Sequence, residues 1–433
     1  MQPSNGRQRV VILGGGFGGL KAAKSLAGAA VDVTLIDQRN FHLFQPLLYQ
    51  VATGGLSPAN IAAPLRSLVR KQRNCRVILG RAVDFDFATK EVVLEDERVP
   101  FDTLIVAAGA KHSYFGKNQW EPLAPGLKTI EDATEIRRRV LSAFERAERI
   151  TSEAERRRLL RFIVIGGGPT GVELAGTLIE IARHTLKKDF RRINPAEAHV
   201  VLIEAGPRIL AAFDEDLSGK AVDELRRLGV EVRLRTMVVD VTSTGVKVKE
   251  GDLEESLPAA TVLWAAGVQG AVIGDALAKA TAAERDRAGR LIVRPDFTLP
   301  GHPEVFVIGD LSAYRDANGA LLPGVAPAAM QAGSYVASVI SARLAGAPEP
   351  EFRFKDPGSM ATIGRGAAVV KLGRWKFTGY FAWLTWLFVH LLFLVQFQNR
   401  LMVLMQWAWN YVTFNRSARL ITDTNRFLGE PER

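Results

Sequence analysis

Near its start the chain has the stretch Val10-Val11-Ile12-Leu13-Gly14-Gly15-Gly16-Phe17-Gly18-Gly19, an apolar run that breaks into the pattern Gly-x-Gly-x-x-Gly. A second copy, Phe162-Ile163-Val164-Ile165-Gly166-Gly167-Gly168-Pro169-Thr170-Gly171, follows about one domain's length later. In each copy a helix-compatible stretch comes next, which is the context in which the pattern predicts a dinucleotide-binding turn. The glycines permit a tight turn and a close approach of the main chain to a pyrophosphate. Two copies predict a protein that binds two dinucleotides and passes electrons between them.

The composition is that of an α/β enzyme with more than one domain. The chain has 433 residues, 47% of them hydrophobic, and 39 glycines. The single cysteine, Cys75, excludes a disulfide framework or a redox Cys-x-x-Cys pair within one chain, and six scattered histidines give no metal-ligand spacing. Residues 1–9 are polar and lack the apolar region of a secretory signal. The net charge of +10 suits nucleic acid or an anionic membrane surface.

An acidic residue ends the strand that follows each glycine pattern. Asp37 ends the run 31–37 at nearly the usual ~20-residue spacing, which predicts a ribose-binding carboxylate rather than a solvated strand-end Asp. Glu204 follows the run 199–203 at a longer spacing, and we expect Arg183 to Asn194 to extend the preceding helix. A carboxylate there pairs with a 2′-hydroxyl and repels a 2′-phosphate, which predicts NADH rather than NADPH.

Other segments fit the same plan. Residues 40–64 are apolar but broken by prolines and glycines, so they either line a cofactor or substrate pocket or form a buried connector. Residues 77–109 predict a small β-rich excursion, and the strand-then-Ala-Ala-Gly pattern of 103–109 returns at 261–267. A helix rich in small residues, within 323–340, suits close packing under a flavin.

The C-terminal region differs from the rest of the chain. Residues 380–395 form an apolar run of 16 residues, short of the ~20 that span a bilayer, and polar residues interrupt it before a second run at 401–405. Five of the seven tryptophans fall between 375 and 409, and eight Lys/Arg stand against three Asp/Glu from Lys371 onward. This pattern favours a monotopic interfacial anchor first, a dimer interface second and a transmembrane helix third. A membrane anchor also explains the basic charge, so binding of nucleic acid is not expected. One face could dimerise while another meets lipid.

Taken together, longer motifs resemble those of one family over essentially the whole chain. The stretches that carry the resemblance are 40–54 (NFHLFQPLLYQVATG), 124–133 (APGLKTIEDA), 166–176 (GGGPTGVELAG), 262–268 (VLWAAGV) and the tail at 386–401. They resemble the type II NADH dehydrogenases, the single-chain, non-proton-pumping NADH:quinone oxidoreductases of the two-dinucleotide flavoprotein superfamily. The resemblance implies that NADH reduces bound FAD and that two electrons then pass to a membrane quinone, ubiquinone or menaquinone.

The resemblance also assigns residues. It implies FAD on Gly14, Gly16, Gly19, Asp37 and Asp310, and NADH on Gly166, Gly168, Gly171 and Glu204. It makes Glu173 a carboxylate near the nicotinamide and flavin, whereas its position alone equally suits a first-turn acid that stabilises the helix. Further cofactor-binding residues are expected at Phe17, Gly18, Thr53, Val83, Ala108, Gly109, Thr170, Ala266, Gly267, Gly309, Ala328 and Ala329.

One departure concerns the quinone. Many members carry Ala-Gln-x-Ala-x-Gln beside the flavin, whereas this chain has Ala326-Pro327-Ala328-Ala329-Met330-Gln331. Pro327 replaces the first glutamine, so a quinone held by two glutamine amides is not available. Gln331 remains the expected quinone contact.

The expected architecture is α/β, with two Rossmann-like, glutathione-reductase-like domains and a C-terminal amphipathic helical membrane anchor. An FAD-binding domain is expected over 7–115 and 290–345, an NADH-binding domain over 116–289, and a membrane-anchoring and dimerising region over 346–433. The expected protein is a homodimer, peripheral on the cytoplasmic face of a bacterial inner membrane. Alternatives are a flavin-dependent NADH oxidase or electron-carrier reductase, and a redox-sensing flavoprotein. The cysteine count argues against sulfide:quinone oxidoreductases.

Overall fold

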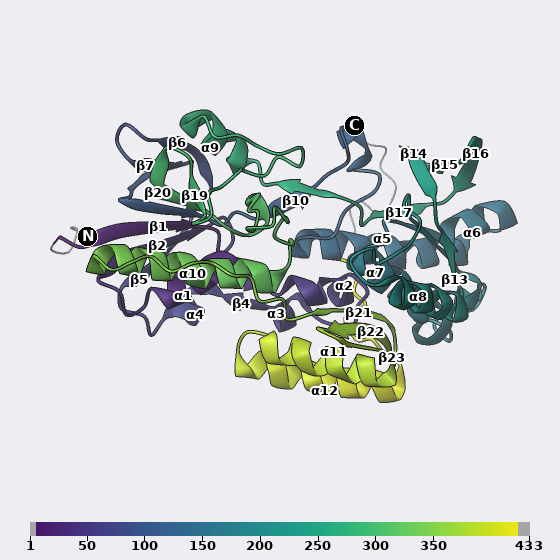
Figure 1. Ribbon diagram of the computed structural model, residues 1–433. Helices are drawn as coiled ribbons and strands as arrows, with labels where there is room; N and C mark the ends of the chain where they lie inside the picture. Colours follow the sequence, from purple (N-terminus) through teal and green to yellow (C-terminus); the bar gives the residue numbers. More distant parts are fainter. Residues whose placement is uncertain (1–5, 423–433) are drawn as a thin grey trace. The chain divides into compact units, whose positions relative to one another are not determined.

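The computed structural model describes residues 6–422, and these divide into two compact units (Figure 1). Unit 1 comprises 6–43, Ala62–Lys111 and Val268–Pro357, and unit 2 comprises Phe44–Ile61, His112–Gly267 and 358–422. These boundaries differ from the functional domains expected above, because 44–61 belongs to unit 2, 268–289 belongs to unit 1, and the C-terminal region divides after Pro357 between the two units. The functional division stays a prediction.

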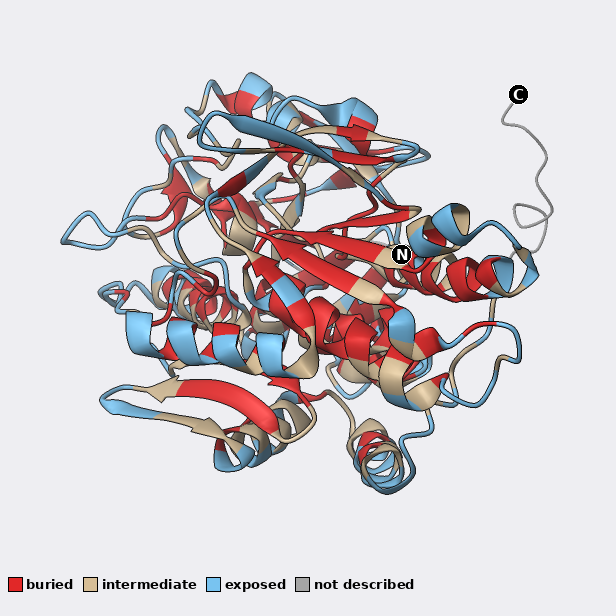
Figure 2. Ribbon diagram, turned by 90° about the vertical axis from the view of Figure 1, so that its right-hand side faces the viewer, coloured by how far each residue is buried: buried red, intermediate tan, exposed pale blue. Residues whose placement is uncertain are grey.

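Unit 1 is built on a six-stranded sheet with the order β19-β20-β9-β1-β2-β5. Five strands are parallel: β1 (Gln8–Leu13), β2 (Val31–Asp37), β5 (Cys75–Leu79), β9 (Thr103–Val106) and β20 (His302–Val307), with β19 (Thr298–Leu299) antiparallel. The central strands are buried, as Figure 2 shows, because helices or a second layer cover both faces of a parallel sheet. The predicted strand at 31–37 is confirmed, and its register with β1 places Asp37 just beyond Leu13↔Ile36.

Two helices of unit 1 lie side by side, α1 (Phe17–Ser25) and α10 (Ala326–Ala345) (Figure 1). They approach closely because glycines face each other: a Cβ on Gly333 would overlap the carbonyl oxygen of Gly18. The predicted β-rich excursion is a three-stranded antiparallel sheet. The smaller elements are β3 (Phe41–Leu43), β4 (Ala62–Pro64), α4 (Leu65–Val69), β6 (Ala82–Asp86), β7 (Glu91–Leu94), β8 (Arg98–Pro100), β18 (Val268–Gly270), α9 (Ile273–Thr281) and η5 (Gly309–Leu311).

Unit 2 repeats the plan on a four-stranded parallel sheet with the order β13-β12-β11-β17. Its strands are β11 (Arg161–Ile165), β12 (His199–Ile203), β13 (Val230–Arg233) and β17 (Thr261–Trp264). The helices are α5 (Ile130–Arg149), α6 (Glu153–Leu159), α7 (Pro169–Glu180) and α8 (Glu215–Leu228). A three-stranded sheet of β14 (Thr236–Thr242), β15 (Gly245–Glu250) and β16 (Leu253–Pro258) completes this part, with short elements η2 (Asn118–Trp120) and η4 (Pro195–Glu197). The strand β10 (Ala110–His112) lies where the chain passes from unit 1 to unit 2.

The segment between α7 and β12 corrects one expectation. The helix continues through a π-helical turn, Ile181–Thr185, and then ends, so it does not extend to Asn194. The Glu148 carboxylate accepts hydrogen bonds from the main-chain N–H groups of Arg191, Arg192 and Ile193. These N–H groups are therefore held by a side chain instead of by a helix, and the segment turns back toward β12.

The C-terminal region packs within unit 2. An antiparallel sheet of β21 (Ser359–Gly364), β22 (Ala367–Leu372) and β23 (Trp375–Gly379) leads into α11 (Tyr380–Phe393) and α12 (Phe397–Thr413). The two helices lie side by side (Figure 1). The 44–61 insert adds η1 (Gln45–Leu47), α2 (Leu48–Ala52) and α3 (Pro58–Ile61). Within 6–422, every helix is too short or too polar to cross a bilayer.

Candidate functional site

The first glycine-rich turn has the geometry of a pyrophosphate cradle. Gly14 has a φ of +102°, and a Cβ there would overlap the carbonyl of Ala107 on the neighbouring strand. A Cβ on Gly19 would overlap the carbonyl oxygen of Gly14. Gly16 is different, since no described atom lies within 4 Å of its Cβ position and no side chain caps the helix there. The N–H groups at the start of α1 are therefore open to an anion, which fits a dinucleotide phosphate.

The predicted carboxylate stands beside this turn. Asp37 accepts hydrogen bonds from the N–H of Gly15 (2.6 Å) and of Arg39 (2.7 Å), and burial raises its pKa. The sequence analysis missed His42, whose Nδ1 lies 2.9 Å from the carbonyl oxygen of Gly15. Burial lowers the pKa of His42, so the ring is neutral and its Nδ1–H donates to that carbonyl. The turn is thus held from both sides.

The second turn repeats this construction in unit 2. Gly166 has a φ of +108° and a Cβ would lie 2.7 Å from the carbonyl of Ala265, while Gly168 again has open space. Glu204 accepts hydrogen bonds from the N–H of Gly167 and of Gly206, both at 2.6 Å. Glu204 lies farther along the chain than expected for such an acid. The β11–β12 pairing nevertheless gives it the position in unit 2 that Asp37 has in unit 1.

The structure brings some of the other predicted residues together. Gly309 lies beside Ala329 at the start of α10, and Asp310 Oδ1 lies 3.4 Å from the Cβ position of Gly324. Other expected residues in unit 1 are Phe17, Gly18, Ala108, Gly109 and Ala328, and in unit 2 Thr170, Ala266 and Gly267. Val83 is exposed on β6, whereas Thr53 is buried in unit 2. The cofactor contacts of all these residues stay predictions.

Glu173 is buried on α7 and accepts a hydrogen bond from the main-chain N–H of Thr362. Burial raises the pKa of this carboxyl well above its ordinary value, because the charged form loses its solvation. The alternative of a first-turn acid does not apply, since the first turn of α7 contains no acidic residue.

Gln331, the expected quinone contact, has both ends of its amide engaged. Its Nε2 donates to the carbonyl oxygen of Lys355 (2.8 Å) and its Oε1 accepts from the N–H of the same residue (2.9 Å). To contact a ligand, the amide would have to give up one of these bonds. The role therefore remains a prediction that the geometry does not favour.

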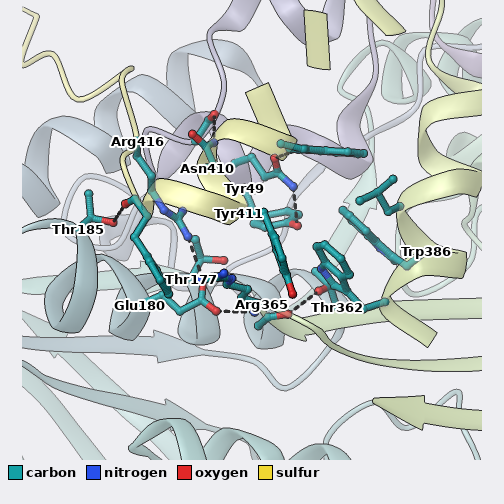
Figure 3. A pocket seen from close by; sticks show the side chains of 17 residues that line it. Tyr49, Thr177, Glu180, Thr185, Thr362, Arg365, Trp386, Asn410, Tyr411 and Arg416 are labelled. Carbon is teal, nitrogen blue, oxygen red and sulfur yellow. Dashed lines mark hydrogen bonds and ion pairs between the residues drawn. The ribbon is translucent and has the colours of Figure 1, made fainter. Parts of the chain in front are cut away.

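An aromatic pocket of about 120 Å³ lies within unit 2 (Figure 3). Its aromatic lining is Tyr49, Trp383, Trp386, Trp407, Tyr411 and Phe414. Its polar lining includes Gln50, Thr177, Glu180, Arg365, Asn410 and Arg416. These residues come from α2, α7, the β21–β22 turn, α11, α12 and the segment after α12, so the pocket unites stretches that lie far apart in sequence. The expectation that 40–64 lines a pocket is supported by Tyr49, Gln50 and Gly55.

One side of the aromatic pocket is charged. Arg416 donates to Glu180 (3.0 Å) and to the Thr53 hydroxyl (3.3 Å), and burial lowers its pKa. The Glu180 carboxylate also accepts from the main-chain N–H of Arg365. The Arg365 guanidinium lies over the rings of Tyr411 (4.1 Å) and Phe414 (3.8 Å), which are cation–π distances. Sequence reasoning missed these residues; the only signal was a pair of arginines after the apolar tail.

The other side holds an ordered hydrogen-bond chain. Trp407 Nε1 donates to Gln50 Oε1 (2.7 Å), and Gln50 Nε2 donates to the Tyr49 hydroxyl (2.9 Å). The Trp386 ring lies 5.6 Å from that of Trp407 and 6.5 Å from that of Tyr49. The pocket therefore combines flat apolar walls with a few fixed polar groups, the usual character of a small-molecule site.

Comparisons with known proteins agree with this geometry. A family model described as "Pyridine nucleotide-disulphide oxidoreductase" matches residues 8–333, and one described as "NDH2 C-terminal domain" matches residues 357–416. The type II NADH:quinone oxidoreductase Ndh of Mycobacterium tuberculosis is 47% identical over 429 residues, covering 97% of this chain and 92% of that protein. The type II NADH:quinone oxidoreductase of Staphylococcus haemolyticus is 31% identical, covering 83% of this chain and 88% of that protein.

Solved structures show the same fold. NDH2 from Plasmodium falciparum in complex with NADH superposes with a TM-score of 0.88 at 21% identity, covering 96% of this chain and 100% of that chain. The sulfide:quinone oxidoreductase of Aquifex aeolicus superposes with a TM-score of 0.71 at 17% identity, covering 97% of this chain and 94% of that chain. The predicted α/β fold with two dinucleotide-binding domains and a helical C-terminal region is confirmed.

Proposed function

The chain belongs to the family of type II NADH:quinone oxidoreductases, and on that premise we propose how its residues divide the work of the reaction. It oxidises NADH and reduces a quinone without pumping protons, using FAD. When bound, FAD supplies the redox chemistry that links oxidation of the hydride donor to reduction of the quinone. The protein binds, orients and shields the reactants.

The two glycine-rich turns bind the two dinucleotides. FAD lies on the turn of unit 1, with Asp37 at its ribose, and NADH lies on the turn of unit 2, with Glu204 at its ribose. The observation that carries this assignment is the matched geometry: each turn has an uncapped helix start, an open second glycine and a carboxylate fixed by main-chain N–H groups. The functional domains expected from the sequence follow this division. The Glu204 carboxylate repels a 2′-phosphate, which favours NADH over NADPH.

The quinone head group binds in the aromatic pocket. Flat aromatic walls suit a planar ring, and several of them belong to α11 and α12. Outside the pocket these helices expose a large apolar surface, made by Tyr380, Phe381, Phe388, Leu392, Phe393, Phe397, Leu401, Met402, Met405, Trp409 and Val412. A quinone dissolved in lipid would therefore reach the pocket along the same helices that meet the bilayer.

The protein binds the membrane surface through this apolar face. The positive charge of the tail contributes less than its count implies, because several of its charges are neutralised within unit 2. Lys371 and Lys376 pair with Asp214, and Arg419 pairs with Asp189. Attachment is thus chiefly hydrophobic, with aromatic rings at headgroup level. We place the enzyme on the cytoplasmic face of a bacterial membrane, as a homodimer formed through the C-terminal region; multi-angle light scattering in detergent tests the dimer.

The first experiment is stopped-flow spectroscopy of the detergent-solubilised protein. Flavin absorbance near ~450 nm should bleach rapidly with NADH and recover rapidly when a short-chain quinone is added. Bleaching without recovery would overturn the quinone-reductase function and favour an oxidase or a redox sensor. Slow bleaching with NADH but fast bleaching with NADPH would overturn the role of Glu204.

Glu173 tests the assignment of the protonated carboxyl. In Glu173→Gln the shape of the side chain and its acceptor oxygen are retained, but the acidic proton is lost. Turnover should fall by about tenfold or more while the flavin stays bound. Quinone-reduction kinetics equal to those of the unaltered protein would remove Glu173 from the mechanism.

The membrane assignment is tested by sedimentation with phospholipid vesicles. Phe381 and Phe397 are 77% and 79% exposed on α11 and α12, so Phe381→Ser with Phe397→Ser should release the protein from vesicles. Leu253→Ser is the matched control, since Leu253 is 79% exposed on β16. Equal release by both changes, or by neither, would contradict attachment through α11 and α12.

A further inference from the structure

The direction of the Trp407–Gln50–Tyr49 hydrogen-bond chain follows from elementary chemistry. An indole N–H can only donate, so the Gln50 atom that faces Trp407 Nε1 must be its carbonyl oxygen. The Gln50 NH₂ group then faces Tyr49 and can only donate, so the Tyr49 hydroxyl oxygen accepts. The Tyr49 proton therefore points away from Gln50. Within residues 6–422 no group accepts that proton.

Tyr49 is 5% exposed and its side chain lines the aromatic pocket, so this free donor stands at a built site. Burial raises the pKa of Tyr49 well above its ordinary value, and the hydroxyl keeps its proton at any working pH. A buried donor without an acceptor is costly and is rare in native structures. A ligand with an acceptor atom would remove that cost.

A second observation in the same pocket points to the same kind of ligand. Trp386 is 2% exposed, and its Nε1–H has no hydrogen-bond partner in the part of the chain that the structure describes. Trp386 stacks on His390 (4.3 Å between ring centroids), and burial lowers the pKa of His390 to about 4, so no positive charge lies behind the indole. Two donors without acceptors, set among aromatic walls, are complementary to a planar ligand that carries acceptors only.

We infer that the Tyr49 hydroxyl, held in direction by Gln50 and Trp407, donates the hydrogen bond that orients a carbonyl oxygen of the quinone. A quinone ring is planar and carries two carbonyl acceptors, which matches this pocket. The bond strengthens as that oxygen gains negative charge during reduction, because charge-assisted hydrogen bonds are stronger than neutral ones. Tyr49 contacts the substrate, whereas Gln50 and Trp407 are positioning residues. The inference rests on the proposed quinone pocket.

The test is isothermal titration calorimetry of the oxidised FAD-loaded protein with ubiquinone-1, without NADH. Tyr49→Phe removes the donor and keeps the ring, and should raise the dissociation constant about fivefold to tenfold. Trp407→Phe frees the Gln50 amide to turn over and accept the Tyr49 proton, so it should weaken binding by a similar factor. The double variant should then be little weaker than Tyr49→Phe alone, because both changes remove the same interaction.

Two controls separate the possible outcomes. Trp383→Phe removes an indole from the same pocket without touching the chain, so its effect measures the loss of ring area and should be smaller than that of Trp407→Phe. Unchanged binding in Tyr49→Phe, or effects that multiply in the double variant, would overturn the inference. If Tyr49→Phe does not fold, as judged by flavin content and thermal unfolding, the inference is tested by comparing Trp407→Phe with Trp383→Phe. Equal losses of ubiquinone-1 binding in these two variants would then overturn it.

A pocket-filling change tests the proposed function separately. Leu387 lines the pocket on α11, and Leu387→Trp should abolish ubiquinone-1 binding, whereas Leu387→Met should retain it. If Leu387→Trp blocks binding while Tyr49→Phe does not weaken it, the assignment of the quinone pocket is supported and the role of Tyr49 as hydrogen-bond donor is wrong. If Leu387→Trp leaves binding intact, the pocket assignment itself fails.

Discussion

The two dinucleotide turns are built alike, but the helices that follow them are covered by different neighbours. In unit 1, α1 packs against the helix α10, through Gly18 and Gly333. In unit 2, α7 packs against the strand β21, and a Cβ on Gly176 would overlap the carbonyl oxygen of Ile363. The second helix is therefore joined directly to the sheet that leads into α11 and α12.

The two helices also differ in the side chains that they carry. The face of α7 near β21 and the aromatic pocket carries Glu173, Thr177 and Glu180, of which Glu173 and Thr177 are buried. Counted from the last glycine of each pattern, Glu173 corresponds to Lys21, which is only partly buried, and Thr177 to Ser25, which is exposed. The glycine turns are built alike in both copies, whereas at these matched positions the second helix has buried polar side chains and the first does not.

The largest expected effect comes from Gly176→Ala. Because α7 and β21 approach within van der Waals distance at this glycine, a methyl group would force them apart, at a cost of about 3 kcal/mol. The midpoint of thermal unfolding should fall and quinone binding should weaken with it. Gly219→Ala is the control, since Gly219 is exposed on α8 with nothing near its Cβ position, and it should stabilise by about 0.5–1 kcal/mol. Equal midpoints for the two variants would show that the contact is not tight.

The second prediction separates the two turns. In Asp37→Asn an amide NH₂ must face the N–H of Gly15 or of Arg39, so the turn of unit 1 loses a hydrogen bond. Retention of FAD through gel filtration should drop sharply. Glu204→Gln makes the same change in unit 2 and should retain FAD but weaken NADH binding about tenfold, or about 1.4 kcal/mol, and narrow the preference over NADPH. Loss of FAD from Glu204→Gln would reverse the assignment of the two turns.

The smallest expected effect concerns pH. The pKa of Glu173 lies well above the ordinary value that it has in the unfolded chain. As the pH rises past the ordinary value, the unfolded state loses its proton first, so the folded state loses relative stability until the pH reaches the folded pKa. Glu173→Gln does not titrate, and its unfolding midpoint relative to the unaltered protein should therefore increase as the pH rises above the ordinary pKa of a glutamate. A constant difference over this range would mean that the carboxyl is not held protonated.

Local patterns allowed much of the fold and both dinucleotide turns to be predicted. The strands, the glycines and the acids lie within short stretches whose geometry depends on near neighbours, as with β1, Gly14 and β2. Glu204 could be predicted as the acid at the end of its strand despite the unusual spacing, because an apolar strand that ends in an acid is itself a local signal. The helix extension over 183–194 was wrong, since the side chain of Glu148, from another helix, holds that segment in a turn.

Residues 40–64 could be expected to line a pocket, but the rest of its lining could not be predicted, because its polar contacts join residues far apart in sequence. The Gln50–Trp407 bond joins positions 357 residues apart, and the Arg416–Glu180 pair joins positions 236 apart. Gln331 is the opposite case: its residue type suits a quinone contact, which stays a prediction, but its amide bonds to the main chain of Lys355, 24 residues on. Whether a polar side chain is available depends on its partners, and the sequence does not show them.

The distance between Gln50 and Trp407 along the chain also sets an order of events during protein synthesis. The first glycine turn and Tyr49 leave the ribosome early, but the indole that fixes the direction of the Tyr49 hydroxyl is added 357 residues after Gln50. At about 5–20 residues per second this is a delay of roughly 20–70 s. The aromatic pocket therefore forms only after the segment that carries the first glycine turn has long been synthesised. Completion of α12 is then the step that closes the aromatic pocket, and with it the proposed quinone site.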